Sequence, residues 1–202
     1  TKLINGLIPH FVEGGTLSGT TIVNGMNVAQ TEMYRLAEQV GSVFQNPKSQ
    51  FFNIDSDSEI TFGLENAGVE PRKIKERYDA TVSALKIQSL LGRNIFSMSG
   101  GEKQSLAFAS VYAMNPSIFV LDEPTANLDY GNSCRVMERV QQLGRQGYTI
   151  IFSTHDPNQA FSYATKVLAL KDGGVMAVGA PEAVLTQAVL SRLYGIPVAR
   201  CE

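Results

Sequence analysis

Ser117–Asp129 reads SIFVLDEPTANLD, and this stretch predicts the fold. Its first half, Ile118–Leu121, is a short continuous apolar run, which is typical of a strand buried on both faces of a parallel sheet. Asp122 and Glu123 follow at once, so both carboxylates are expected at the carboxyl edge of that sheet, where open α/β folds bind ligands. In nucleotide hydrolysis such an aspartate helps to hold Mg²⁺, and a neighbouring glutamate can polarise the attacking water. The two residues alone are also compatible with a solvated acidic turn.

Other apolar runs of the same kind predict further strands. Two of them, Val40–Phe44 and Thr149–Phe152, have the character of buried parallel strands. Lys166–Leu170 is followed by a Lys-Asp-Gly-Gly turn and a return strand, Val175–Val178, and a shorter hairpin is expected where Gly19–Val23 runs into an Asn-Gly turn. Helical patterns alternate with these runs, so we predict an α/β sheet with right-handed crossovers.

The range 47–114 differs from the rest of the chain because it contains helical patterns and no convincing strand. Its predicted helices are Ser58–Asn66, Pro71–Ile87 and Ser99–Met114. We interpret 47–114 as a helical subdomain inserted into an α/β core that consists of residues 1–46 and 115–202.

The last of these helices begins with an unusual sequence, Ser-Gly-Gly-Glu. Ser99 followed by Glu102 is a capping box, in which the serine caps the helix and the glutamate bonds back to the serine N–H. Gly100 and Gly101 are poor helix formers and cost roughly 1 kcal/mol each against alanine. They leave bare N–H groups at the positive end of a helix, which suits a phosphate. A well-capped helix start without a ligand is the alternative.

Two more polar side chains follow predicted strands. His155 directly precedes a helix that Asp156 can cap, with Pro157 at its first position. Gln45 follows the first buried strand. Each residue alone is more simply structural. Together with the carboxylate pair, however, they place polar side chains from three strands at one predicted sheet edge.

This ordered set resembles the nucleotide-binding subunit of an ABC transporter over nearly the whole chain. Gln45 matches the family's Q-loop, and Met98–Glu102 (MSGGE) resembles the signature usually written LSGGQ, with methionine and glutamate as departures. The IFVLDE sequence matches Walker B, Ala126–Asp129 matches the D-loop, and His155 matches the switch histidine.

The resemblance implies a P-loop NTPase (RecA-like) fold, ATP and Mg²⁺ as cofactors, and two subunits, identical or different, that clamp two ATP molecules. Each ATP would lie on the Walker motifs of one chain and under the signature of the other. The implied catalytic residues are Glu123, His155 and Gln45; the implied nucleotide-binding residues are Ser99, Gly100, Gly101, Glu102, Asp122 and Asp129; Asp122 and Gln45 would hold Mg²⁺. A transmembrane transporter subunit and a peripheral place on the cytoplasmic face of the cell membrane are implied as well.

The family's phosphate loop is not found in this sequence. Thr1–Leu7 reads as the end of a helix, and in the family the helix after the GK[ST] loop continues into sequence of this kind. No Gly-Lys pair occurs in the 202 residues. The loop supplies backbone donors, a lysine and a Mg²⁺ ligand, and losing one preorganised donor typically costs roughly 3–4 kcal/mol in the transition state. We therefore expect the chain as given, without this loop and the family's N-terminal strands, to hydrolyse ATP poorly or not at all.

Two explanations of the absent loop stay open. One is an N-terminal truncation of an ordinary transport ATPase, which we favour. The other is a natural protein that begins at Thr1 and acts as a catalytically inactive partner, offering Ser99, Gly100 and Gly101 to an intact ATPase.

The subfamily and the cargo also stay open. Gly6–Phe11 and Val43–Phe52 resemble ATPases of energy-coupling-factor importers, which bring in vitamins or metal ions, whereas Arg192–Val198 resembles ATPases of iron-chelate and cobalamin importers. The SGGEK sequence also occurs in DNA-repair and chromosome-organising ATPases. Those proteins carry long coiled coils, and no sustained heptads occur here.

Composition adds limits on partners. The chain is 44% hydrophobic and 18% charged, with a net charge of −2, so it has no global attraction to nucleic acid, which we do not expect as a partner. No apolar run approaches the roughly 20 residues that span a bilayer. Cys134 and Cys201 do not have the spacing of metal ligands.

Overall fold

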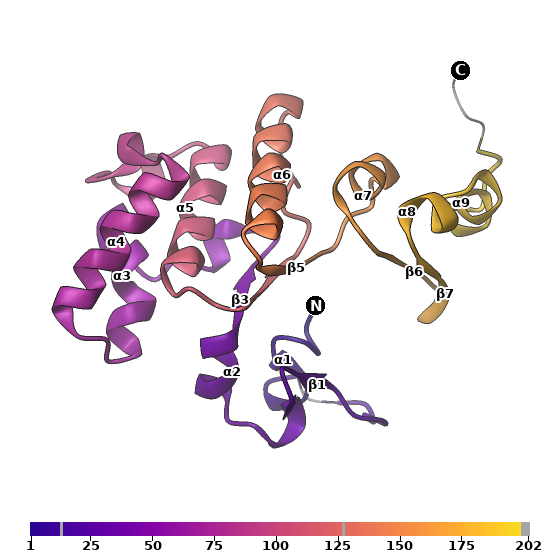
Figure 1. Ribbon diagram of the computed structural model, residues 1–202, viewed down its shortest axis with the longest axis horizontal. Coiled ribbons are helices and arrows are strands. Elements are labelled where there is room, and N and C mark those ends of the chain that lie inside the picture. The colour runs from indigo at the N-terminus through magenta and orange to yellow at the C-terminus, as the bar shows by residue number, and fades with distance from the viewer. Residues whose placement is uncertain (13, 127, 199–202) are drawn as a thin grey trace. The chain divides into compact units, whose positions relative to one another are not determined.

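The structure is a computed structural model that describes residues 1–12, 14–126 and 128–198. Figure 1 shows its ribbon. The chain forms two compact units, residues 1–153 and 154–202, and each is described by itself. Asn127 of the predicted D-loop and Cys201 lie outside the described residues.

A parallel sheet organises the first unit. Its strands are β3 (Val40–Val43), β4 (Ile118–Leu121) and β5 (Thr149–Phe152), in the order β3-β4-β5. The predicted bounds of β4 and β5 are confirmed, and β3 is one residue shorter than predicted. The prediction that β5 is buried is wrong, because Thr149 and Ile151 are exposed. The register pairs Val43 with Leu121 and Leu121 with Phe152, so the carboxyl ends of all three strands reach the same edge.

The central strand is buried on both faces, as its continuous apolar sequence predicts. Ile118 and Val120 point to one face, where they join a buried cluster. The other members of that cluster are Val23, Val28, Leu36 and Val40. Phe119 points to the opposite face, where its ring stacks on Phe108 at 5.6 Å and meets Tyr148 edge-on at 5.4 Å.

Three α-helices lie between β3 and β4 in the sequence: α3 (Ser56–Asn66), α4 (Pro71–Leu85) and α5 (Gly100–Ala113). They pack against one another, and α5 also packs against β3 (Figure 1). Residues 47–114 are all described and contain no strand, only an isolated bridge between Asp55 and Asn94. The division into a core and an inserted helical subdomain stays a prediction, because residues 1–153 cluster as one unit.

The N-terminal segment shows one difference from expectation. The predicted helix end over Thr1–Leu7 is wrong in its extent, because residues 2–6 form turns and α1 is a short helix at Leu7–His10. Gly6, at a φ of 79°, adopts the left-handed conformation that interrupts a right-handed helix. The predicted hairpin is confirmed as β1 (Ile22–Val23) and β2 (Met26–Asn27), joined by the Asn-Gly turn.

The remaining elements complete the two units. In the first unit these are α2 (Met33–Gln39), α6 (Tyr130–Arg145) and the 3-10 helices η1 (Val28–Gln30), η2 (Pro47–Ser49), η3 (Gln88–Leu90) and η4 (Ile95–Ser97). The second unit holds α7 (Pro157–Tyr163), the antiparallel pair β6 (Val167–Lys171) and β7 (Gly174–Gly179), α8 (Pro181–Val184) and α9 (Gln187–Tyr194). Within the described part of the chain, no helix combines the length and the apolar character needed to cross a membrane.

Candidate active site

A serine that follows β5 contacts both acidic residues after β4, one through its carboxylate and the other through its backbone. The Ser153 hydroxyl donates to Asp122 Oδ1 at 2.7 Å and accepts the Glu123 N–H at 2.9 Å. A hydroxyl has one proton to donate and lone pairs to accept, so a single side chain can make both bonds. Glu123 has a φ of 46°, in the left-handed region, which is strained for a residue other than glycine. Ser153 thus bonds the carboxylate of Asp122 and the backbone of Glu123, and the Glu123 backbone has the unusual conformation.

Ser153 was not among the residues predicted to form the site. The only signal in the sequence is its position, directly after a predicted strand and shortly before His155. The register of β4 and β5 decides its role, because it places the residues that follow the two strands next to each other.

Gln45 lies at the same sheet edge as Asp122. The Asp122 N–H donates to the Val43 carbonyl at 2.9 Å, which extends the β3–β4 pairing past the ends of the strands. Gln45 is exposed and follows β3 by two residues. Mg²⁺ prefers oxygen ligands and is usually bound by one or two protein carboxylates together with phosphates and water. The carboxylate and amide oxygens at this edge therefore fit a magnesium ion that is shared with a nucleotide.

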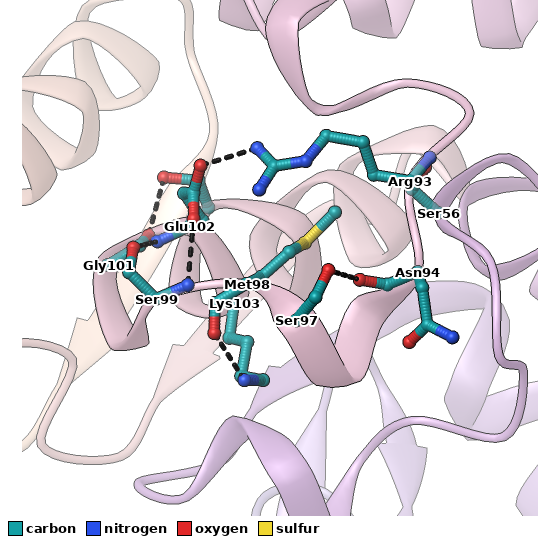
Figure 2. Close-up of polar contacts among 10 residues, drawn as sticks. Ser56, Arg93, Asn94, Ser97, Met98, Ser99, Gly101, Glu102 and Lys103 are labelled. Atoms are coloured by element: carbon teal, nitrogen blue, oxygen red, sulfur yellow. Dashed lines mark hydrogen bonds and ion pairs between the residues drawn. The ribbon is translucent and has the colours of Figure 1, made fainter.

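The predicted capping box at the start of α5 is confirmed (Figure 2). The Glu102 N–H donates to Ser99 Oγ at 3.3 Å, and the Ser99 N–H donates to Glu102 Oε2 at 2.7 Å. Ser99 and Gly100 are exposed, and a Cβ on Gly100 would have nothing within 4 Å. The start of α5 is therefore open to a ligand, although its role in nucleotide binding stays a prediction.

Glu102 also forms an ion pair that the sequence did not indicate. Arg93 Nη1 lies 2.6 Å from Glu102 Oε1 (Figure 2). This bond, together with the bonds to Ser99, lowers the pKa of Glu102 to about 2. The carboxylate is therefore ionised at neutral pH.

The next residue of α5 is a buried lysine. Lys103 Nζ donates to the carbonyls of Met98 and Phe96, the latter at 3.3 Å. These bonds tie Phe96 and Met98 to the first turn of α5, and Figure 2 shows the bond to Met98. The predicted signature is thus supported by a lysine that belongs to the same SGGEK sequence.

The other two predicted residues lie apart from this cluster in the chain. Asp129 caps α6 by accepting the Asn132 N–H at 2.8 Å. This hydrogen bond lowers the pKa of Asp129. His155 belongs to the second unit, where it is exposed and its carbonyl accepts the Tyr194 hydroxyl at 2.8 Å. The predicted cap of α7 by Asp156 is confirmed. A catalytic role of His155 and nucleotide binding by Asp129 stay predictions.

The sequence matches the profile of the ABC transporter family over residues 1–126. The chain belongs to the ABC transporter family. A putative ABC transporter ATP-binding protein of Treponema denticola is 49% identical over 175 residues, which cover 87% of this chain and 36% of that protein. A protein with the same description in Pyrococcus abyssi is 36% identical over 196 residues, which cover 96% of this chain and 70% of that protein.

Solved structures agree with this assignment. The structure of cbiO1 from Clostridium perfringens, described as part of the ABC transporter complex cbiONQ, has a TM-score of 0.80 and 28% identity, and the match covers 95% of this chain and 75% of that one. A dimeric ATP-binding cassette with bound ADP and Pi has a TM-score of 0.73 at 20% identity, which shows the fold alone. The predicted α/β P-loop NTPase fold of the ABC ATPases is confirmed. The chain spans 36% or less of the first four curated relatives.

Proposed function

We propose that the protein containing this chain is the ATP-hydrolysing subunit of an ABC-type importer of a vitamin, a metal ion or a metal chelate. The observation that carries the proposal is the hydrogen-bonded unit of Asp122, Glu123 and Ser153 at the carboxyl edge of a parallel sheet. Open α/β sheets bind ligands at this edge, and the two acidic residues match the Walker B sequence of the ABC family, to which the chain belongs.

The side chains at this edge divide the chemistry between them. The Glu123 carboxylate orients and polarises the attacking water, as a general base does in phosphoryl transfer. Asp122 and Gln45 hold Mg²⁺, which supplies positive charge against the phosphates when it is bound. Ser153 keeps Glu123 and Asp122 fixed, so little reorganisation is needed during the reaction.

The start of α5 serves the ATP of a second nucleotide-binding subunit, either a copy of this chain or a related one. Ser99 caps the N-terminus of α5 and is followed by Gly100 and Gly101, and the helix dipole there favours a phosphate. His155 contacts the terminal phosphate in this proposal, and Asp129 lies at the junction of the two subunits.

An apolar patch next to the Q-loop supports docking of a transmembrane subunit. Phe52, Ile54 and Phe96 are 77%, 64% and 73% exposed. The Ile95 N–H donates to the Ile54 carbonyl at 2.8 Å, which joins the two segments, and Phe52 stacks on Phe62 at 4.8 Å. Contiguous exposed apolar side chains of this kind mark interaction sites. The similarity to cbiO1 favours an importer of the energy-coupling-factor type, with this subunit on the cytoplasmic face of the membrane.

Glu123→Gln in the complete natural gene product tests the proposal. We expect wild-type protein to hydrolyse ATP and the variant to turn over at least 100-fold more slowly, the scale of losing a positioned general base. ATP affinity should stay within about threefold, because the substitution removes only the group that orients water. Glu138→Gln, on the exposed side of α6, is the matched control and should behave as wild type.

Two other results would contradict the proposal in different ways. Wild-type turnover in Glu123→Gln would remove the assigned role of Glu123. If Glu123→Gln has no effect on an assembled pair while Ser99→Arg abolishes its hydrolysis, the chain is an inactive partner that offers only its signature.

A further inference from the structure

The signature carries a glutamate where the family usually has a glutamine, and this change creates an electrostatic problem. Glu102 lies in the first turn of α5, and its side chain is 32% exposed. Because its pKa is lowered to about 2, the carboxylate is not neutralised by protonation at physiological pH. A negative charge one helical turn from a bound phosphate would repel that phosphate. The protein therefore needs another way to neutralise Glu102.

Arg93 supplies the missing positive charge. Its Nη1 contacts Glu102 Oε1 at 2.6 Å, while the Ser99 N–H occupies Oε2 at 2.7 Å (Figure 2). Each carboxylate oxygen thus has its own donor. The carboxylate is thereby held in the capping box, between the Ser99 N–H and the Arg93 guanidinium.

Arg93 is itself held in place by its backbone. The Arg93 N–H donates to Ser56 Oγ at 3.2 Å, and the Ser56 N–H donates to the Arg93 carbonyl at 3.0 Å. The preceding Gly92 N–H donates to Asp57 Oδ2 at 2.6 Å, and the Tyr78 hydroxyl donates to the other oxygen of Asp57. Because these anchors use the backbone of Arg93, replacing its side chain leaves them in place.

Other cations lie near Glu102 without forming this contact. Lys86, Arg135 and Arg139 line a cavity of about 240 Å³ that Glu102 also lines. Among the described residues, the ion pair of Glu102 is with Arg93. The adjacent Lys103 directs its ammonium to backbone carbonyls instead. The neutralisation of Glu102 therefore depends on one arginine.

We propose that Arg93 is a positioning residue of the nucleotide site, which neutralises Glu102 and keeps its carboxylate in the capping box so that the start of α5 can accept the terminal phosphate of ATP bound by a second subunit. This inference rests on the proposed function. The inference adds to the nucleotide site a residue that lies outside the signature. The role of this residue, Arg93, is to neutralise the negative charge of Glu102.

A double-mutant cycle in the complete natural gene product tests the inference. Arg93→Met removes the charge and keeps a long side chain, and we expect it to raise KM for ATP roughly tenfold, the scale of losing a hydrogen bond to a charged group. Glu102→Gln is the reference for the cycle, and its own KM is measured rather than assumed to be that of wild type. Adding Arg93→Met to Glu102→Gln should change KM by less than about threefold, because a neutral glutamine needs no compensation.

Two further variants sharpen the cycle. Arg93→Lys keeps the charge and should retain most of the wild-type affinity. Lys86→Gln removes an exposed cation from the wall of the same cavity and should leave KM unchanged. High salt should reduce the defect of Arg93→Met, because screening weakens the repulsion between the carboxylate and the phosphate.

Each outcome of the cycle decides a question. If wild-type protein neither binds nor hydrolyses ATP, the proposed function fails and this inference fails with it. If wild type is active and Arg93→Met matches it, only the inference is overturned. If the double variant is as impaired as Arg93→Met, or if both variants are unfolded, Arg93 has a merely structural role and the inference is also overturned. An unfolded Arg93→Met with a folded and active double variant supports it.

Discussion

Replacing Ser153 by alanine removes a hydroxyl that bonds to both acidic residues after β4. The hydroxyl donates to Asp122 Oδ1 at 2.7 Å and accepts the Glu123 N–H at 2.9 Å. Alanine leaves both groups in place and takes away only the oxygen between them. Ser153→Ala therefore tests whether the conformation of Glu123 depends on this bridge.

The contacts of Ser153 set the expected size of the effect. A hydrogen bond to a charged group contributes about 1.5–3 kcal/mol, and a left-handed residue other than glycine costs about 1–2 kcal/mol. Glu123, at a φ of 46°, loses the acceptor that helps to hold this conformation. If about 2 kcal/mol of this positioning is lost in the transition state, kcat falls roughly 30-fold.

Steady-state ATP hydrolysis by the complete natural gene product is the assay, with kcat and KM determined separately. We expect the loss in kcat and little change in KM, because Ser153 acts through groups that position water and metal. Ser153→Thr keeps the hydroxyl and should retain most of the activity. Ser110→Ala, in α5, removes a hydroxyl that bonds only within its own helix, to the Ala107 carbonyl, and serves as the matched control.

Two results would refute this reasoning. A kcat within twofold of wild type in Ser153→Ala would show that the strand ends hold the carboxylates without the serine. A raised KM with an unchanged kcat would show that Ser153 contributes to binding rather than to the position of Glu123.

Two stability predictions complete the set. Gly41→Ala should destabilise the fold by about 1–3 kcal/mol in urea unfolding, because a Cβ would lie 2.7 Å from Pro116 Cγ in the packed interior. Gly144→Ala is the control, because Gly144 is exposed in α6 and a Cβ there would have nothing within 4 Å. This substitution should be neutral or stabilising. Equal effects of the two substitutions on stability would refute the packing argument. The pKa of Glu102 is about 4.5 in the unfolded chain and about 2 in the folded protein. The ion pair with Arg93 therefore stabilises the fold above pH 4.5, and this stabilisation is lost as the pH falls towards 2. The stability advantage over Glu102→Gln should therefore disappear across this range, and a constant difference would contradict the pairing.

The strands and caps were predictable because their signals lie within a few neighbouring residues. Ile118–Leu121 is apolar at every position, and it forms the central strand with the predicted bounds. The capping box of Ser99 and Glu102 needs only a spacing of three residues. Periodicity and caps depend on local geometry, so the sequence is sufficient to find them.

The contacts that organise the site could not be predicted in this way. Ser153 lies 31 residues from Asp122 in the chain, and Arg93 is anchored by Ser56 across 37 residues. No local spacing connects such pairs. The register of the sheet and the packing of α3 against α5 bring them together.

The sequence by itself therefore determined the family, the order of the motifs and the bounds of β4 and β5, because these follow from neighbouring residues. Only the tertiary structure decided that a serine supports the carboxylate pair and that an arginine neutralises the signature glutamate. A hydrogen bond or an ion pair needs two groups within about 3 Å of each other. Ser153 and Asp122 are 31 residues apart and Arg93 and Glu102 are nine apart, and neither pair lies within one helix or strand, so the packed fold brings their groups this close.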